Sequence, residues 1–188
     1  MQVERRQVEL PPSGPWVVAI VADTHSKPHP SILEHLRALQ PNLILHGGDI
    51  GDLGVLTSLE AVAPLVAVRG NIDGQTAAVP EAIVLDCTLG ARLVFRIFLT
   101  HIAVAGPRIR PEVRREAQAV DAQLVVCGHS HVPFLARDRG LAVFNPGSIG
   151  PRRFQLPITY GVLRLEAGEV KLQHYDCETN QRWLPSRS

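Results

Sequence analysis

Polar residues that could bind a metal ion recur along this chain, and each follows a short apolar stretch. These residues are Asp23, His25, Asp49, Asn71, His101, His129 and His131. Two carboxylates, an amide and four imidazoles make a hard-to-borderline ligand set without a thiolate. Such a set suits Mn²⁺, Fe, Zn²⁺ or Ni²⁺ better than Ca²⁺ or a structural cysteine-rich zinc. Seven ligands are too many for one ion, so they divide naturally between two ions that share a carboxylate.

Each residue taken alone also has a structural explanation. An aspartate after a strand can cap a helix or form a turn. A lone histidine is more often a hydrogen-bonded structural residue than a ligand, and we interpret His29, His35 and His174 in that way. The pair His129-Ser130-His131 after an apolar strand is harder to explain without a ligand. The combination therefore favours a metal site.

Short apolar strands must position these side chains. The run 16–22 is continuous and rich in β-branched residues, as in a strand buried on both faces. Similar strands are predicted at 43–45, 65–68, 93–99 and 124–127. In open α/β sheets, ligands bind beyond the carboxyl ends of the strands. We therefore expect the seven candidates to converge there.

The spacing of apolar residues predicts helices between the first strands. Ile32, Leu33, Leu36 and Leu39 form one face of a helix that Pro41 ends. A second helix is expected over 53–62, and a third after Pro111. Strand–helix–strand with short connections indicates a parallel sheet.

The later part of the chain has a different pattern. Segments 82–86 and 93–99 are predicted to form a hairpin, and 141–144, 160–165 and 170–174 to be strands, with the last pair turning at Ala167-Gly168. We expect mixed sheets flanked by helices in a single domain over 16–188. Residues 1–15 hold three prolines and little apolar content, which predicts a loose lead-in.

Composition limits the class of protein. The chain has 188 residues, 45% of them hydrophobic, and a net charge of +1, which excludes a disordered chain. The absence of a global basic field makes binding of duplex nucleic acid unexpected. The run 16–22 is too short to span a membrane, and three unpatterned cysteines suit a reducing cytoplasm. The expected setting is cytoplasmic, without a membrane.

Five ordered motifs resemble those of the calcineurin-like metallophosphoesterases. They are Asp23-x-His25, Gly48-Asp49, Gly70-Asn71-x-Asp73, Thr100-His101 and Gly128-His129-x-His131. The run Asn145-Pro146-Gly147-Ser148 resembles an element of the small, single-domain prokaryotic phosphodiesterase branch. The resemblance implies an α/β fold, a four-layer αββα sandwich in which two mixed sheets pack between helices.

The resemblance also implies a division of ligands between two divalent transition-metal ions, of which Mn is expected first. One ion would take Asp23, His25, Asp49 and His131; the other would take Asp49, Asn71, His101 and His129, with Asp49 bridging. A metal-bridging hydroxide would attack phosphorus, so Asp49, Asn71, His101 and His46 are expected to serve catalysis. His46 either orients a ligand or is structural.

Three positions depart from the family pattern. Ile72 stands where many relatives have a histidine that protonates the leaving group, and Ile102 stands where a glycine is usual. Asp73 loses its usual histidine neighbour and is expected to be a loop residue or to support a ligand. Arginines on predicted loops could meet the substrate phosphate, although solvated surface charge is the simpler role. These arginines are Arg108, Arg110, Arg152 and Arg153.

The expected function is hydrolysis of a small phosphate ester, such as a nucleotide, by a phosphodiesterase. One alternative is a phosphomonoesterase or nucleotide hydrolase on the same site. Another is a non-catalytic scaffold of this fold that binds protein partners. An exposed edge of the late strands would allow homo-oligomerisation.

Overall fold

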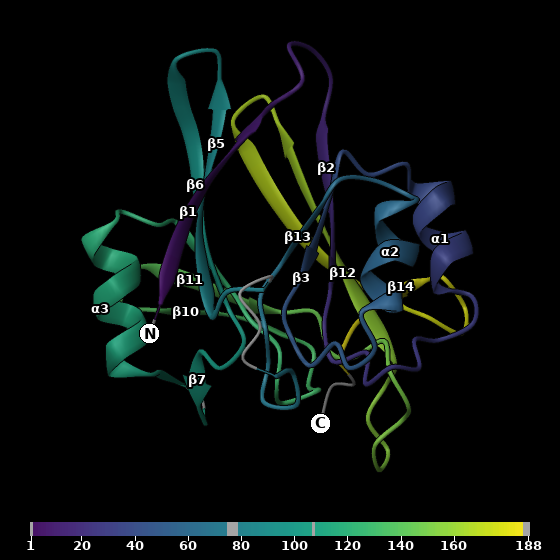
Figure 1. Ribbon diagram of the computed structural model, residues 1–188. Coiled ribbons are helices and arrows are strands. Elements are labelled where there is room, and N and C mark those ends of the chain that lie inside the picture. Colours follow the sequence, from purple (N-terminus) through teal and green to yellow (C-terminus); the bar gives the residue numbers. More distant parts are fainter. Residues whose placement is uncertain (1, 75–78, 107, 186–188) are drawn as a thin grey trace.

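Two six-stranded sheets lie face to face at the centre of the molecule (Figure 1). The computed structural model describes residues 2–74, 79–106 and 108–185. Sheet A has, in spatial order, β1 (Val3–Glu9), β5 (Ala82–Leu89), β6 (Arg92–Thr100), β9 (Leu124–Val126), β11 (Leu141–Asn145) and β10 (Phe134–Asp138). Sheet B has β14 (Arg182–Trp183), β13 (Glu169–Asp176), β12 (Thr159–Glu166), β2 (Trp16–Val21), β3 (Leu43–His46) and β4 (Leu65–Ala67). A small hairpin joins β7 (Val104–Ala105) to β8 (Arg108–Ile109).

Strand β2 shows why the first apolar run is continuous. Successive side chains of a strand point to opposite faces. Val18 and Ile20 belong to the core between the two sheets, whereas Val17, Ala19 and Val21 belong to the core beneath the helices. Both faces are therefore apolar, as the sequence predicted.

The three helices cover the outer faces of the sheets. Helices α1 (Ile32–Leu39) and α2 (Gly54–Glu60) pack on sheet B, and α3 (Pro111–Ala119) packs on sheet A (Figure 1). The buried residues Leu36, Leu59 and Val113 make these contacts. The order helix–sheet–sheet–helix confirms the predicted four-layer sandwich. No helix in the described ranges is long and apolar enough to cross a bilayer.

Strand directions follow the predicted change of pattern only in part, because β9 also pairs in parallel with β6. Strands β2, β3 and β4 are parallel, and β5 with β6 and β12 with β13 form antiparallel hairpins. Ala167 and Gly168 both have positive φ, at 50° and 81°, which is the geometry of a type I′ turn. Strand β11, however, pairs parallel with β9, because the preceding β10 forms the antiparallel hairpin with it.

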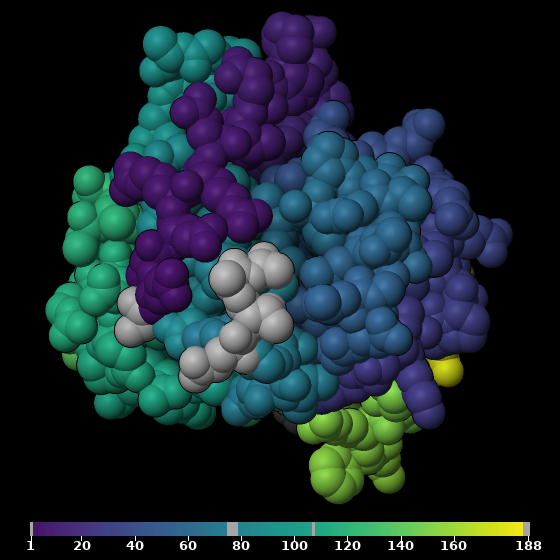
Figure 2. All heavy atoms as spheres, viewed as in Figure 1, coloured from purple at the N-terminus to yellow at the C-terminus, as the bar shows by residue number. Residues whose placement is uncertain are grey.

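The segment predicted to be a loose lead-in contains strand β1. It pairs in parallel with β5 along its own whole length, from Val3 opposite Ala82 to Glu9 opposite Thr88. The side chains of Arg5 and Gln7 bond to Asp86 and Thr88 across the strands. Backbone pairing and polar cross-strand contacts therefore order an edge strand that has little apolar content. Figure 2 shows this strand in purple on the surface.

Gly161 lets the two sheets approach closely. A Cβ atom at this position of β12 would lie 2.3 Å from Phe144 Cε1, and the Phe144 ring is fully buried in the core between the sheets. We predict that Gly161→Ala lowers the free energy of unfolding by about 1–3 kcal/mol, because a packed core yields little to an added methyl group. Gly74→Ala is the control, since its Cβ would meet no atom within 4 Å. Equal urea midpoints for both variants would contradict this account.

Candidate metal centre

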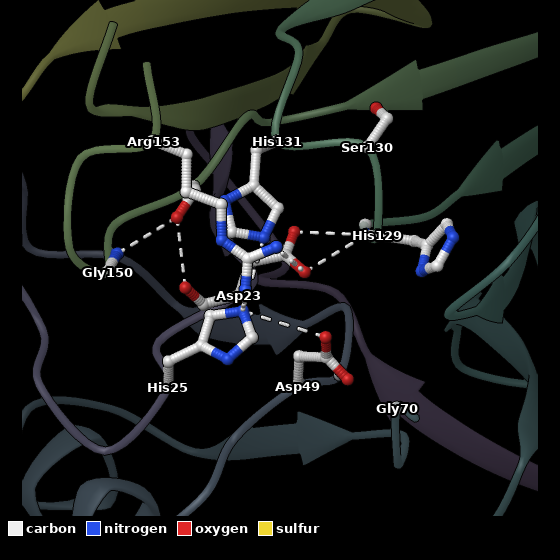
Figure 3. Close-up of polar contacts among 12 residues, drawn as sticks. Asp23, His25, Asp49, Gly70, His129, Ser130, His131, Gly150 and Arg153 are labelled. Atoms are coloured by element: carbon white, nitrogen blue, oxygen red, sulfur yellow. Dashed lines mark hydrogen bonds and ion pairs between the residues drawn. The ribbon is translucent and has the colours of Figure 1, made fainter. Parts of the chain in front are cut away.

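The candidate ligands meet where strands of both sheets end. Asp23 follows β2 and Asp49 follows β3 in sheet B, whereas His101 follows β6 and His131 follows β9 in sheet A. In Figure 3, the side chains of Asp23, His25, Asp49 and His131 point toward one another. The site thus lies across the ends of two packed sheets, which hold it more rigidly than free loops would.

Five of the candidates have a left-handed backbone. Their φ angles are 56° at Asp23, 47° at His25, 55° at Asp49, 72° at His129 and 59° at His131. Residues other than glycine rarely adopt this region, although Asp, Asn and His do so more often than others. Clusters of such residues are typical of functional sites, where the surrounding structure imposes the conformation.

Two groups of donor atoms are close enough to hold ions. The first is Asp23, His25 and His131, and the second is Asp23, Asp49 and His101; within each group the donors lie within 4.8 Å of one another. In the first group, His131 Nε2 is 3.2 Å from His25 Nε2 and 3.5 Å from Asp23 Oδ1. Asp23 belongs to both groups, so the two groups adjoin.

Asp49 lies between the two halves of the site. Its Oδ2 is 3.6 Å from His25 Nε2, and its Oδ1 is 3.3 Å from His101 Nε2. The resemblance implied Asp49 as the shared ligand, whereas the donor groups found here share Asp23. The two oxygens of Asp49 nevertheless face histidines of different halves. Its position is therefore suited to a bridging ligand.

The chemistry of His101 supports the binding of a cation. His101 Nδ1 donates to Gly47 O at 2.7 Å, which leaves Nε2 without a proton in the neutral ring. Nε2 is buried and has no hydrogen-bond partner among the described residues. A backbone acceptor on one nitrogen commonly orients the other toward a metal. The donor spacings of 3.2–3.6 Å also match neighbouring ligands of one ion with bonds of about 2.1 Å, so these residues fit the expected ions.

Asn71 and His129 lie at the margin of the site. His129 is exposed, and its ring meets that of His101 edge to face at 5.2 Å. Its backbone N–H donates to both Asp23 carboxylate oxygens, at 3.1 and 3.0 Å. Asn71 is exposed and lines a cavity beside His101. The His129 side chain belongs to neither group of donors that lie within 4.8 Å of one another. The roles of His129 and Asn71 as ligands therefore stay predictions.

His46 lies beneath the site with both ring nitrogens engaged. Nδ1 accepts from Gly48 N at 3.1 Å, and Nε2 is 3.0 Å from Thr24 Oγ1. Thr24 in turn donates to the Asp49 and Ile50 carbonyls. Complete burial lowers the pKa of His46 to about 4, so its ring is neutral at pH 7. His46 therefore supports the loops that carry Asp23 and Asp49 and has no free nitrogen for an ion.

Asp73 holds the Asp49 loop in place, a role that the sequence indicated only loosely. Its carboxylate accepts from the backbone N–H groups of Ile50, Gly51 and Gly70, at 2.7–3.0 Å. Gly70 is required for this approach, because a Cβ atom there would lie 2.2 Å from Asp49 N and Oδ1. A charged acceptor on three backbone donors is a strong local constraint.

The Asn145–Ser148 motif supports the site from the other side. Asn145 Nδ2 donates to Gly128 O at 2.6 Å, next to His129. Ser148 Oγ donates to Asp23 O at 2.9 Å and accepts from Gly150 N. The motif therefore fixes the backbones of two loops that carry candidate ligands.

Burial and neighbouring charges shift the pKa values of the candidate ligands. Burial raises the pKa of Asp23 to about 7 and lowers that of His131 to about 4. Burial alone would raise the pKa of Asp49, but the nearby His101 holds it well below its usual range. The same pair acts on His101, where the Asp49 carboxylate outweighs burial and raises the pKa. Asp23 is thus the candidate ligand whose carboxyl group is about half protonated near pH 7.

These shifts predict that metal binding releases protons. Because a cation must displace the proton of Asp23, affinity for Mn²⁺ should rise as pH rises and flatten above about pH 7. The slope should be about tenfold per pH unit for each displaced proton. Calorimetric titration at several pH values, in buffers of different ionisation enthalpy, measures both quantities. Asp23→Asn should bind more weakly and with a shallower slope; an affinity independent of pH between 5.5 and 7 would refute this.

Loss of the Asp73 charge should loosen the Asp49 loop. We predict that Asp73→Asn lowers stability by about 1–3 kcal/mol, because an amide nitrogen faces backbone donors, and weakens Mn²⁺ binding by about 10–100-fold. Asp176→Asn is the matched control, since Asp176 Oδ1 also accepts from two backbone N–H groups, in the exposed turn after β13. Asp176→Asn should lower the free energy of unfolding but leave the affinity for Mn²⁺ unchanged. Unchanged metal affinity in Asp73→Asn would show that Asp73 does not hold the Asp49 loop in place for metal binding.

Comparison with known proteins agrees with this geometry. The chain is similar to a probable metallophosphoesterase of Methanothermobacter thermautotrophicus, 28% identical over 160 residues, which cover 82% of this chain and 88% of the relative. It is also similar to the phosphodiesterase YfcE of Escherichia coli, 31% identical over 107 residues, which cover 55% and 54% of the two chains. The structure of Vacuolar Protein Sorting 29 from Cryptosporidium parvum has the same fold, with a TM-score of 0.72, 21% identity and coverage of 89% and 94%. Residues 17–168 match the calcineurin-like phosphoesterase superfamily domain, and the chain therefore belongs to this superfamily.

Proposed function

We propose that this protein is a phosphodiesterase that uses two divalent transition-metal ions, Mn²⁺ first among them. The observation that carries the proposal is the pair of adjoining donor groups that share Asp23. His25 and His131 would complete one ion site, and Asp49 and His101 the other. Asn71 and His129 are the proposed outer ligands of the second site.

The bound ions would supply Lewis acidity toward the phosphoryl oxygens and lower the pKa of a water molecule. The protein's own residues fix where this happens. His101 is oriented by its bond to Gly47 O, and the Asp49 loop is held by Asp73. In the proposed reaction, a water oxygen bonds to phosphorus, one ester P–O bond breaks, and the departing oxygen gains a proton.

The residue at position 72 bears on the choice of leaving group. Ile72 is 51% exposed and can donate no side-chain proton. Its backbone N–H is engaged by Asp49 Oδ1 at 3.2 Å. A leaving group would then take its proton from solvent, which favours esters of acidic alcohols or phenols, whose oxyanions are stable.

Two hollows beside the site suit a diester rather than a monoester. A cavity of about 480 Å³ runs from Asn71 and His101 to Arg110 on one side. An apolar groove of about 310 Å³ runs from His129 to Val132 on the other. Ile102 lines both. A phosphate held between them would have room for two organic substituents, and a monoester has only one.

The decisive assay is hydrolysis of bis(p-nitrophenyl) phosphate by metal-stripped protein resupplied with Mn²⁺. We predict metal-dependent turnover that exceeds turnover of p-nitrophenyl phosphate. Asp49→Asn should lose at least about 100-fold in kcat/KM, since losing a ligand costs more than losing its supporting partners. Asp52→Asn on the same loop is the control, because either residue can accept the bond from Gly54 N that begins helix α2.

The other outcomes have clear meanings. Preference for the monoester would identify a phosphomonoesterase or nucleotide hydrolase on the same site. Protein that binds Mn²⁺, Ni²⁺ or Zn²⁺ but turns over neither ester would be a scaffold.

A further inference from the structure

Arg153 reaches into the candidate metal centre from outside it. It lies on the β11–β12 connection, which protrudes at the bottom of the molecule (yellow-green in Figure 2). Its guanidinium lies over the site in Figure 3, and Nη2 is 3.1 Å from His25 Nε2. Ser148 anchors the start of this connection through its bond to Asp23 O. The loop that carries Arg153 is therefore tied to a ligand loop.

This contact uses the atom that a metal ion would need. A neutral imidazole nitrogen has one lone pair, so His25 Nε2 can accept from Arg153 or bind a cation, but cannot do both. A cation would also repel the guanidinium. Arg153 is exposed, so its side chain can move outward by rotation about its own bonds. After this movement the guanidinium remains within one side-chain length of the site, and its N–H groups are free to donate to another acceptor.

The other nearby arginines are engaged elsewhere. Arg69 pairs with Glu81 at 2.5 Å, and Arg110 pairs with Glu112 at 2.7 Å. Arg152 bonds to Glu178 at 2.7 Å. Arg153, by contrast, has no carboxylate partner within the described part of the chain. It therefore keeps its positive charge available to an anion.

We propose that Arg153 binds the non-bridging phosphoryl oxygens of the substrate. On ion binding, its guanidinium leaves His25 and pairs with the phosphate that the ions hold, in the fork geometry that suits arginine to phosphate. Arg153 thereby gives the phosphate a cationic contact. The apolar side chain of Ile72 cannot provide one. This inference rests on the proposed function, and it makes Arg153 a substrate-binding residue.

The test compares Arg153→Ala and Arg153→Lys with Arg137→Ala, which removes an exposed arginine from strand β10. Inorganic phosphate is the probe, titrated into Mn²⁺-loaded protein by calorimetry. Arg153→Ala should weaken phosphate binding and raise KM for bis(p-nitrophenyl) phosphate by about 10-fold or more, the usual effect of one charged hydrogen bond. Arg153→Lys should recover part of the loss because it keeps the charge without the fork. Arg137→Ala should equal the wild type.

A second readout uses Mn²⁺ alone. Removing Arg153 removes a competitor for His25, so the affinity of Arg153→Ala for Mn²⁺ should stay equal or become a few-fold tighter. Weaker phosphate binding together with undiminished metal binding supports the proposal. Weaker metal binding would show instead that Arg153 supports the ion site, and would overturn it.

Failure of this inference is distinguishable from failure of the proposed function. If the wild type hydrolyses the diester and Arg153→Ala matches it in KM and phosphate affinity, the inference falls and the proposed function stands. If the wild type hydrolyses neither ester but binds phosphate through Arg153, the assignment of Arg153 as a phosphate contact stands and the diesterase falls.

Discussion

Backbone hydrogen bonds between neighbouring loops are the constraint on which the candidate site depends. Asp23 N donates to Gly48 O at 2.9 Å, and His25 N donates to Asp49 O at 3.0 Å. These bonds join the loop after β2 to the loop after β3 and hold the candidate ligand residues in left-handed conformations. Asp73 extends the same network through Ile50 and Gly70. The hydrogen bonds of this network are made to backbone atoms. The loop backbones are therefore fixed, and they set where the carboxylates and imidazoles lie.

The two-sheet core brings these ordered loops together into one site. Sheet B brings the two carboxylates and His25, and sheet A brings His101 and His131. The two sheets share one buried core, in which Ile20 and Val126 take part. A close-packed core resists relative sliding. The distance between donors from different sheets is therefore set by the same packing that stabilises the protein, which explains how residues 106 positions apart come within 3.2 Å.

The sequence predicts much of this arrangement because most candidate site residues directly follow strands with a strong apolar pattern. The run 16–22 and the strand at 124–127 are apolar on both faces, so they and the polar residues after them are visible from sequence. Strand β1 is not visible from the sequence, because its order depends on pairing with β5, 79 residues away, and not on apolar burial. Arg153 gives no strong signal either, since its position depends on the path of an irregular loop. The role of Asp73 is hidden for a related reason: its partners are backbone N–H groups, which every sequence has.

The left-handed ligands carry an evolutionary consequence. Each non-glycine residue in this conformation costs of order 1 kcal/mol, and the fully buried Asp23 adds the cost of its desolvated carboxylate. Selection for stability alone would therefore favour replacing ligands, by glycine above all, while leaving the sandwich intact. A lineage released from selection for catalysis should drift toward a more stable, inert protein whose surfaces are free for other duties. The same strain that orders the candidate site thus makes this architecture a ready source of descendants that lack these residues.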